Sequence, residues 1–102
     1  MEYAFVGGRL RIARTPEEKE ELLLRLRRIE GQVRGLQQMI ADDRYCLEDV
    51  QQLNAITAAA REVSLRLISD HLQACVDCAV QSHEEEAVIA EMVTVLRAAL
   101  RQ

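Results

Sequence analysis

The stretch from Asp70 to Cys78, DHLQACVDC, holds one of the two histidines and two of the three cysteines of this 102-residue chain. His71 and Cys75 are four residues apart, so they are neighbours on one face if the segment is helical. An imidazole and a thiolate in that arrangement can bind a soft metal ion. Cys75 and Cys78 form a Cys-x-x-Cys pair, but a thioredoxin-like redox pair needs its first cysteine at a helix N-terminus that follows a strand. For each of these side chains alone, burial as a small core residue is the alternative.

The elements that must position these residues are three helices. The first follows a capping box, in which Thr15 caps the helix and Glu18 completes the box, and its apolar residues recur every three or four positions up to Ile40. The second is expected from about residue 45 to residue 80, because no Gly or Pro lies inside it, with Asp42 or Asp43 as its cap.

A second capping box, made by Ser82 and Glu85, opens the third helix. The first 14 residues contain Gly7 and Gly8 and show no period, so we expect residues 1–14 to be a flexible, mildly basic arm. We expect residues 15–102 to form one helical domain.

Composition supports a small helical protein. The chain has 4 Gly, 1 Pro, 49% apolar residues and 3% aromatic residues, a balance typical of helical rather than β proteins. A domain of this size has a modest core, so oligomerisation is expected. No apolar run is long enough to cross a membrane, and the start of the chain lacks a signal-peptide pattern. Three cysteines in such a chain suggest reduced thiols and a cytoplasmic location.

The net charge of −4 hides an uneven distribution. The acidic excess lies after Leu67, whereas residues 1–66 balance to zero. Within the first helix, the segment 22–40 has a single acidic residue, Glu30, and a stripe of arginines that can meet phosphates by releasing counterions. A solvated helix face is the alternative interpretation of this stripe. Its members are Arg25, Arg27, Arg28 and Arg34.

Cys46 is predicted to share a face of the second helix with His71 and Cys75, but it lies far from them along the helix. At about 100° per residue, Cys46, His71 and Cys75 project on one side of the second helix. At 1.5 Å per residue, Cys46 and His71 would be roughly 37 Å apart on one straight helix, so a single chain cannot close the site. Two antiparallel copies of this helix would place Cys46 of one chain opposite the other two ligands. The two-fold axis would pass near Ala59 and Ala60, where small side chains permit close approach.

Two thiolates and one imidazole suit Cu(I) or Zn(II), and three ligands without a fourth favour Cu(I). Cys78 projects about 60° from Cys75 and is either a spare thiol or a fourth ligand. No general base lies at helix spacing beside Cys46 within its own chain, so we do not expect an enzyme.

The pieces RIEGQVRG, DRYC and DHLQAC, with their spacing, resemble the copper-sensing operon repressor (CsoR) family, and the resemblance covers Lys19 to Arg97. It implies an all-α transcriptional repressor without a helix-turn-helix. Its three-helix protomer has a long central helix. Antiparallel helix pairs form a four-helix-bundle-like dimer, and two dimers form a homotetramer. The resemblance further implies that the metal-free form binds operator double-stranded DNA and that Cu(I) releases it, turning on copper efflux genes.

The resemblance also assigns roles to individual residues. The Cys-His-Cys triad of the family maps onto Cys46, His71 and Cys75. Two residues that surround the metal ligands in the family map onto Tyr45 and Glu91. The DNA-binding arginines of the family are matched most closely by Arg25 and Arg61, with Arg28 and Arg34 as additions.

Relatives within the family differ in their ligands. A nickel/cobalt sensor needs more nitrogen or oxygen ligands, typically an N-terminal histidine, and this chain has only His71 and His83. The formaldehyde sensor has a proline after the start methionine and lacks the last cysteine, whereas Cys75 is present here. A persulfide sensor uses two cysteines, matching Cys46 and Cys75, and does not need the histidine. Retention of His71 favours copper, and a persulfide-responsive repressor is the alternative. A metal-buffering bundle that never binds DNA is a further alternative, which an operator gel shift separates.

Overall fold

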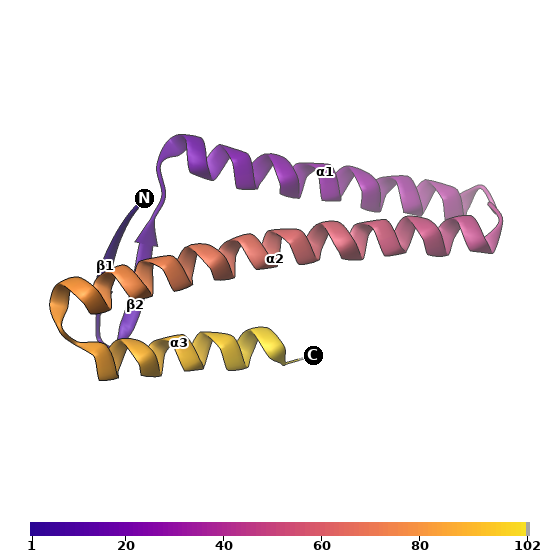
Figure 1. Cartoon of the computed structure of the whole chain (residues 1–102). Coiled ribbons are helices and arrows are strands. Elements are labelled where there is room, and N and C mark those ends of the chain that lie inside the picture. The colour runs from indigo at the N-terminus through magenta and orange to yellow at the C-terminus, as the bar shows by residue number, and fades with distance from the viewer. Residues whose placement is uncertain (102) are drawn as a thin grey trace. The chain divides into compact units, whose positions relative to one another are not determined.

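The computed structural model describes residues 1–101 (Figure 1). The predicted three helices with a long central one are confirmed, and two short strands precede them. The chain forms two compact units, one made by residues 1–15 with the chain from Leu65 onward, the other by Pro16–Ser64. The long central helix contributes to both units. In chain order the elements are β1 (Glu2–Val6), β2 (Arg9–Ala13), α1 (Pro16–Ala41), α2 (Cys46–Ser82) and α3 (Glu85–Leu100).

The two strands form an antiparallel hairpin where the sequence analysis expected a flexible arm. Gly7 and Gly8 are the two loop residues, and both have positive φ, 59° and 74°. A two-residue turn with positive φ at both positions matches the twist of paired strands, which explains the two glycines. The register pairs Val6 with Arg9 next to the turn. Because side chains alternate between the two faces of a strand, the hairpin has an apolar inner face and an outer face that carries charged residues together with Ala4, Val6 and Ala13.

The turn between α1 and α2 has a different cap from the predicted one. Asp43 has a φ of 54°, its N–H donates to the carbonyl of Ile40, and the N–H of Arg44 donates to the carbonyl of Met39. This pattern is a Schellman motif, so Asp43 ends α1 rather than starting α2. The carbonyl of Tyr45 accepts from the N–H of Glu48, and α2 begins at the next residue. The prediction that Asp42 or Asp43 caps α2 was therefore wrong.

Within Pro16–Ser64, α1 and the first half of α2 run antiparallel (Figure 1). Gly35 lies where α2 approaches, because a Cβ built there would be 3.5 Å from Nε2 of Gln52. That same Nε2 donates to the backbone carbonyl of Gln32 at 3.0 Å, so a polar contact fastens the two helices at this level. The two helices therefore approach each other closely at Gly35. At Gly31 the space around an added Cβ is open.

The connection from α2 to α3 also departs from the predicted capping box. Ser82 is the last residue of α2, and its hydroxyl donates to the carbonyl of Cys78 at 2.6 Å. His83 takes a positive φ of 60°, and Glu84 is the N-cap of α3, with no capping hydrogen bond from its side chain. The hydroxyl of Ser82 does accept a hydrogen bond from the N–H of Glu84, so it ties the turn together without capping the helix.

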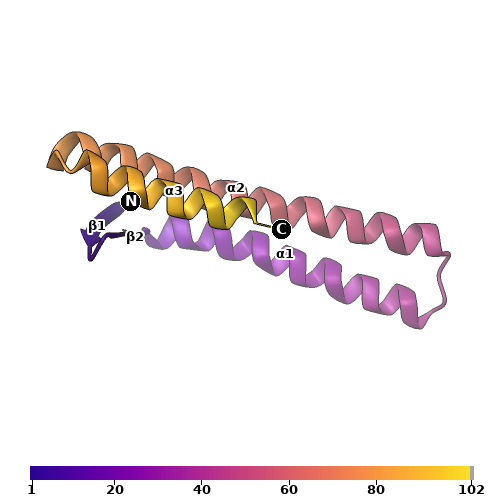
Figure 2. The same cartoon turned by 90° about the horizontal axis from the view of Figure 1, so that it is seen from below.

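The unit that contains the hairpin holds a continuous apolar core. Its buried members come from three elements, with Leu10 from the hairpin, Val88 from α3, and the rest from α2. Figure 2 shows the hairpin beside α3, near the C-terminal end of α2. No helix within residues 1–101 combines the length and the apolar character needed to cross a membrane. The α2 members of this core are Ala74, Cys75 and Cys78.

Candidate metal centre

His71 and Cys75 both face the interior of the unit that holds the hairpin and α3. Cys75 has no exposed surface, and His71 is partly buried. Nε2 of His71 is buried and has no hydrogen-bond partner among residues 1–101. A buried polar atom left unpaired costs about 1–3 kcal/mol, so such an atom indicates a position kept for a ligand.

The Cys75 thiol is buried and lies near the carboxylate of Glu91. Burial raises its pKa above the ordinary value, and the neighbouring Glu91 carboxylate and Cys78 raise it further. Glu91, on α3, is only 8% exposed and accepts a hydrogen bond from the backbone N–H of Leu10. The structure thus places Glu91, which the family resemblance assigned to the surroundings of the metal, close to Cys75.

Cys46 and Tyr45 lie at the other end of α2, in the unit made by Pro16–Ser64. Cys46 is the first residue of the helix and is exposed, and the side chain of Tyr45 is 70% exposed. Among residues 1–101, no group of three or more His, Cys, Asp or Glu side chains is arranged to hold a metal ion. We refer to His71 and Cys75 as the candidate half-site, and α2 continues without interruption between Cys46 and His71.

The remaining soft donors differ in their positions. Cys78 is buried one turn beyond Cys75, and its sulfur lies 3.8 Å from the hydroxyl oxygen of Ser82. His83, in the turn before α3, is exposed and its Nδ1 lies 3.9 Å from a carboxylate oxygen of Glu85. The second histidine thus lies on the surface, while the second buried thiol belongs to the same core as Cys75.

The sequence analysis missed the contacts that the N-terminal residues make with α2 on either side of His71 and Cys75. The guanidinium of Arg14 lies 3.4 Å from the carboxylate of Asp70, which also pairs with Arg66 at 3.4 Å. Tyr3 hydrogen-bonds to Asp77, and this bond, with burial, raises the pKa of the Tyr3 hydroxyl to about 12. The signal for these contacts was the alternation of apolar and polar residues on both sides of the two glycines.

The four arginines expected to bind DNA are exposed and lie in the unit made by Pro16–Ser64. Arg25 pairs with Glu21 at 3.6 Å, and Arg34 pairs with Glu30 at 3.6 Å. Such exposed pairs contribute little to stability, so a phosphate can replace the carboxylate at small cost. Arg25 and Arg28 also line a shallow cavity between α1 and α2, together with Ile29, Gln32, Ala59 and Glu62.

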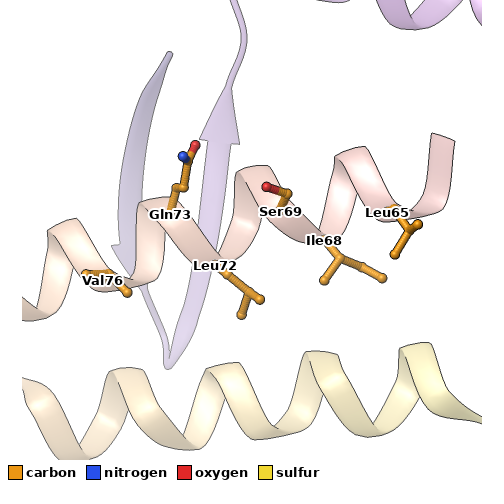
Figure 3. A pocket seen from close by; sticks show the side chains of 6 residues that line it. All are labelled: Leu65, Ile68, Ser69, Leu72, Gln73 and Val76. Carbon is orange, nitrogen blue, oxygen red and sulfur yellow. The ribbon is translucent and has the colours of Figure 1, made fainter. Parts of the chain in front are cut away.

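An apolar groove follows α2 within the unit that holds the half-site. Leu72 lies one residue beyond His71, and its side chain points into this groove together with Ile68 (Figure 3). Leu65 and Val76, at its two ends, are more than half exposed. On the first half of α2, Val50 and Leu53 are equally exposed. Large apolar side chains along a helix are typical of a surface that another helix covers. The groove is completed by Ser69 and Gln73.

These features define a class, a small helical protein whose longest helix carries a partly buried histidine one turn from a buried cysteine. The family description "Metal-sensitive transcriptional repressor" matches residues 18–98. The chain belongs to this family, whose members are transcriptional repressors and not enzymes.

Individual relatives agree with this assignment. The chain is 42% identical over 84 residues to the copper-sensing transcriptional repressor CsoR of Bacillus subtilis (strain 168), covering 82% of this chain and 83% of that one. The crystal structure of the copper-sensing repressor CsoR with Cu(I) from Geobacillus thermodenitrificans NG80-2 superposes on this chain with a TM-score of 0.78 and 41% sequence identity. The match covers 89% of this chain and 95% of that one. The nickel-responsive transcriptional regulator InrS is 30% identical, with a TM-score of 0.80, covering 87% of this chain and all of that one.

Proposed function

We propose that this chain is a Cu(I)-responsive transcriptional repressor. It binds operator DNA in the metal-free form and releases it on binding Cu(I), which derepresses copper efflux and resistance genes. The similarity to copper-sensing repressors supports the effector, and family membership supports the DNA-binding role. A repressor acts where the DNA is, so the proposed location is the cytoplasm.

The observation that carries this proposal concerns Nε2 of His71, one turn from the buried Cys75. This atom is buried and has no hydrogen-bond partner within residues 1–101. An imidazole nitrogen and a thiolate are soft donors that fit Cu(I). We assign Cys46 of a second chain as the third ligand. Nickel fits these residues less well, because it prefers nitrogen and oxygen donors, and the second histidine, His83, lies on the surface away from the core.

The proposed assembly follows from the same shortage of ligands. Two α2 helices that pack antiparallel would each complete the half-site of the other, forming the dimer. The exposed apolar residues of α2 and the groove in Figure 3 are the surface that we assign to helix packing between chains. Two such dimers would form the tetramer.

Signalling requires that bound metal change the surroundings of its ligands. A histidine that binds a metal through one ring nitrogen usually donates its other N–H to a carboxylate or a carbonyl. Glu91 is the buried carboxylate of α3 near Cys75, and Tyr45 precedes Cys46. We assign Glu91 and Tyr45 to this outer shell, through which His71 would act on α3. Arg25, Arg28, Arg34 and Arg61 are assigned to the operator phosphates.

Anaerobic titration with Cu(I), followed in parallel by metal binding and operator binding, tests the proposed function. We expect one Cu(I) per chain and loss of the operator complex over the same range of added metal. Zn(II) and Ni(II) at equal concentrations are the matched controls and should leave the complex intact. Release by Ni(II) but not Cu(I), or no operator binding by the metal-free protein, would contradict the proposal.

A further inference from the structure

The N-terminal hairpin lies outside the part of the chain that matches the family, residues 18–98, and it packs against the core that contains Cys75. Its inner face joins the core that contains Cys75, through the buried Leu10. The other inner-face side chains pack against the same core, and these are Tyr3, Phe5 and Ile12. The hairpin therefore packs next to Cys75, one of the residues that we assign to the metal.

Three polar contacts join the hairpin and the residue that follows it to α2 and α3. The N–H of Leu10 donates to the Glu91 carboxylate on α3. Arg14 pairs with Asp70, the residue immediately before His71. Tyr3 hydrogen-bonds to Asp77, two residues beyond Cys75. The hairpin thus holds the residues on both sides of the half-site and also the carboxylate that we assign to its outer shell.

This cover conflicts with a ligand shared between chains. A sulfur that meets a metal ion together with Cys46 of another chain must reach the protein surface, whereas Cys75 has no exposed area. In the core that surrounds Cys75, the buried side chains from other elements are those of Leu10, on the hairpin, and Val88, on α3. An isolated two-stranded hairpin is marginally stable at best, and this one leads into α1 through the two residues between Ala13 and Pro16. The hairpin is therefore the part of the cover that can leave at the lower cost.

We propose that the N-terminal hairpin is a displaceable cover of the sensor site, and that its docking on Cys75 and Glu91 competes with metal binding by His71, Cys75 and Cys46 of a second chain. This inference rests on the proposed function. Docking would reduce the fraction of chains that are ready to bind, and the apparent affinity for Cu(I) falls by that same fraction. The hairpin would then set the metal concentration at which the repressor leaves DNA.

The first test needs no metal. Leu10→Asp introduces a charge into the core beside Glu91 and should undock the hairpin. Ala4→Asp introduces the same charge on the outer face, opposite Arg11, and is the matched control. We expect Cys75 to be alkylated by iodoacetamide at least about tenfold faster in Leu10→Asp than in the wild type, with urea-unfolded protein as the reference rate. The control should react like the wild type, and both variants should keep their helical circular dichroism. Equal protection of Cys75 in Leu10→Asp and the wild type would overturn the proposal that the docked hairpin covers Cys75.

The second test adds Cu(I) to the full-length wild type and follows amide hydrogen exchange by mass spectrometry. Metal binding should remove the protection of the hairpin amides, Leu10 included. Leu10→Asp should release operator DNA at a free Cu(I) concentration lower by on the order of tenfold, while Ala4→Asp should match the wild type. Hairpin amides that stay protected in the Cu(I)-loaded protein, or an unshifted midpoint in Leu10→Asp, would overturn the competition.

The two tests separate failure of this inference from failure of the proposed function. A wild-type chain that binds no Cu(I) would end the proposed function and the competition together. The alkylation rates would still decide whether the hairpin covers Cys75. A chain that releases DNA with Cu(I) while its hairpin stays docked would keep the proposed function and end the inference.

Discussion

His71 and Cys75 lie one helical turn apart on α2 and turn their donor atoms into the same interior. Nε2 of His71 is buried and finds no hydrogen-bond partner in the described part of the chain, and the Cys75 side chain has no exposed surface. Both belong to the unit that contains the hairpin and α3. The pair supplies two donors to a soft metal ion, and the assignment of the third donor to another chain has direct consequences.

Mixing two inactive variants should restore the metal site. Cys46→Ala lacks the cysteine that would bind metal in the partner's site but keeps its own His71 and Cys75. Cys75→Ala lacks one ligand of its own half-site but keeps Cys46 for the partner's site. A mixed dimer has one complete site, so tight Cu(I) binding should return, at up to one ion per mixed dimer. Each variant alone should bind Cu(I) much more weakly than the wild type, as measured by competition with a chromophoric Cu(I) chelator.

The matched control for this experiment is a mixture of Cys75→Ala with the double variant His71→Ala/Cys75→Ala. Both chains keep Cys46, but neither keeps Cys75, so mixing should restore nothing. Equal recovery in the two mixtures, or tight binding by a chain shown to be monomeric, would contradict a site shared between chains.

Arginine substitutions should separate DNA binding from metal binding. We expect Arg25→Ala and Arg61→Ala to weaken operator binding while the Cu(I) stoichiometry stays unchanged. Loss of one phosphate contact should reduce the slope of log affinity against log salt by about 1. Arg97→Ala, in the last turn of α3, is the control and should leave both quantities unchanged. If Arg25→Ala and Arg61→Ala keep wild-type affinity and salt dependence, the arginine stripe is a solvated face.

Ionisation of Tyr3 should report the docking of the hairpin. In the Tyr45→Phe variant, the remaining tyrosinate absorbance should appear near pH 12, because the hydrogen bond to Asp77 raises the pKa of Tyr3. A pKa raised in the folded state means that this contact stabilises docking below pH 10 and that its contribution is lost as the pH rises through about 12. Asp77→Asn should move the transition toward pH 10. A transition that is the same with and without Asp77 would show that the contact does not form.

Val88→Ala should loosen the packing of α3 on α2 without changing any residue that we assign to the metal. Val88 has no exposed surface and packs in the core with Cys75. Removing two buried methyl-sized groups should lower the free energy of unfolding by about 2 kcal/mol, from the transfer term and the cavity left behind. Urea unfolding at a fixed protein concentration measures this change, because assembly makes stability depend on concentration. Arg97→Ala should stay within about 0.5 kcal/mol of the wild type, and an equal loss in both variants would argue against a core role for Val88.

The helices were predictable because their signals are local and repeated. The absence of Gly and Pro between Tyr45 and Ser82 and the apolar period of α1 are enough to give the number and order of the helices. The helix ends were less predictable. Asp42 and Asp43 have the residue type of an N-cap, but Asp43 ends α1 in a left-handed conformation, which Asp tolerates as well. Two aspartates between helices fit either role, and only the hydrogen bonds distinguish them.

The hairpin was missed because Gly7 and Gly8 were interpreted as flexibility. The same two glycines, flanked by the alternation of Tyr3 and Phe5 with Leu10 and Ile12, are a turn signal. The face shared by His71 and Cys75 followed from a four-residue spacing alone. The contact between Leu10 and Glu91 could not be predicted in this way, since 81 residues separate its partners and tertiary packing brings them together.

The central claim is that His71 couples Cu(I) to DNA release, and one measurement tests it most directly. Operator release is followed by fluorescence anisotropy, under anaerobic conditions, for the wild type and His71→Ala with Cu(I) and separately with polysulfide. We predict that Cu(I) releases the wild type, and that His71→Ala still binds Cu(I) through sulfur but no longer leaves the operator, because allostery requires a ligand to interact differently with the two states. A wild-type protein that ignores Cu(I) but leaves the operator with polysulfide, with His71→Ala responding in the same way, would contradict the account and establish a persulfide-responsive repressor that uses Cys46 and Cys75.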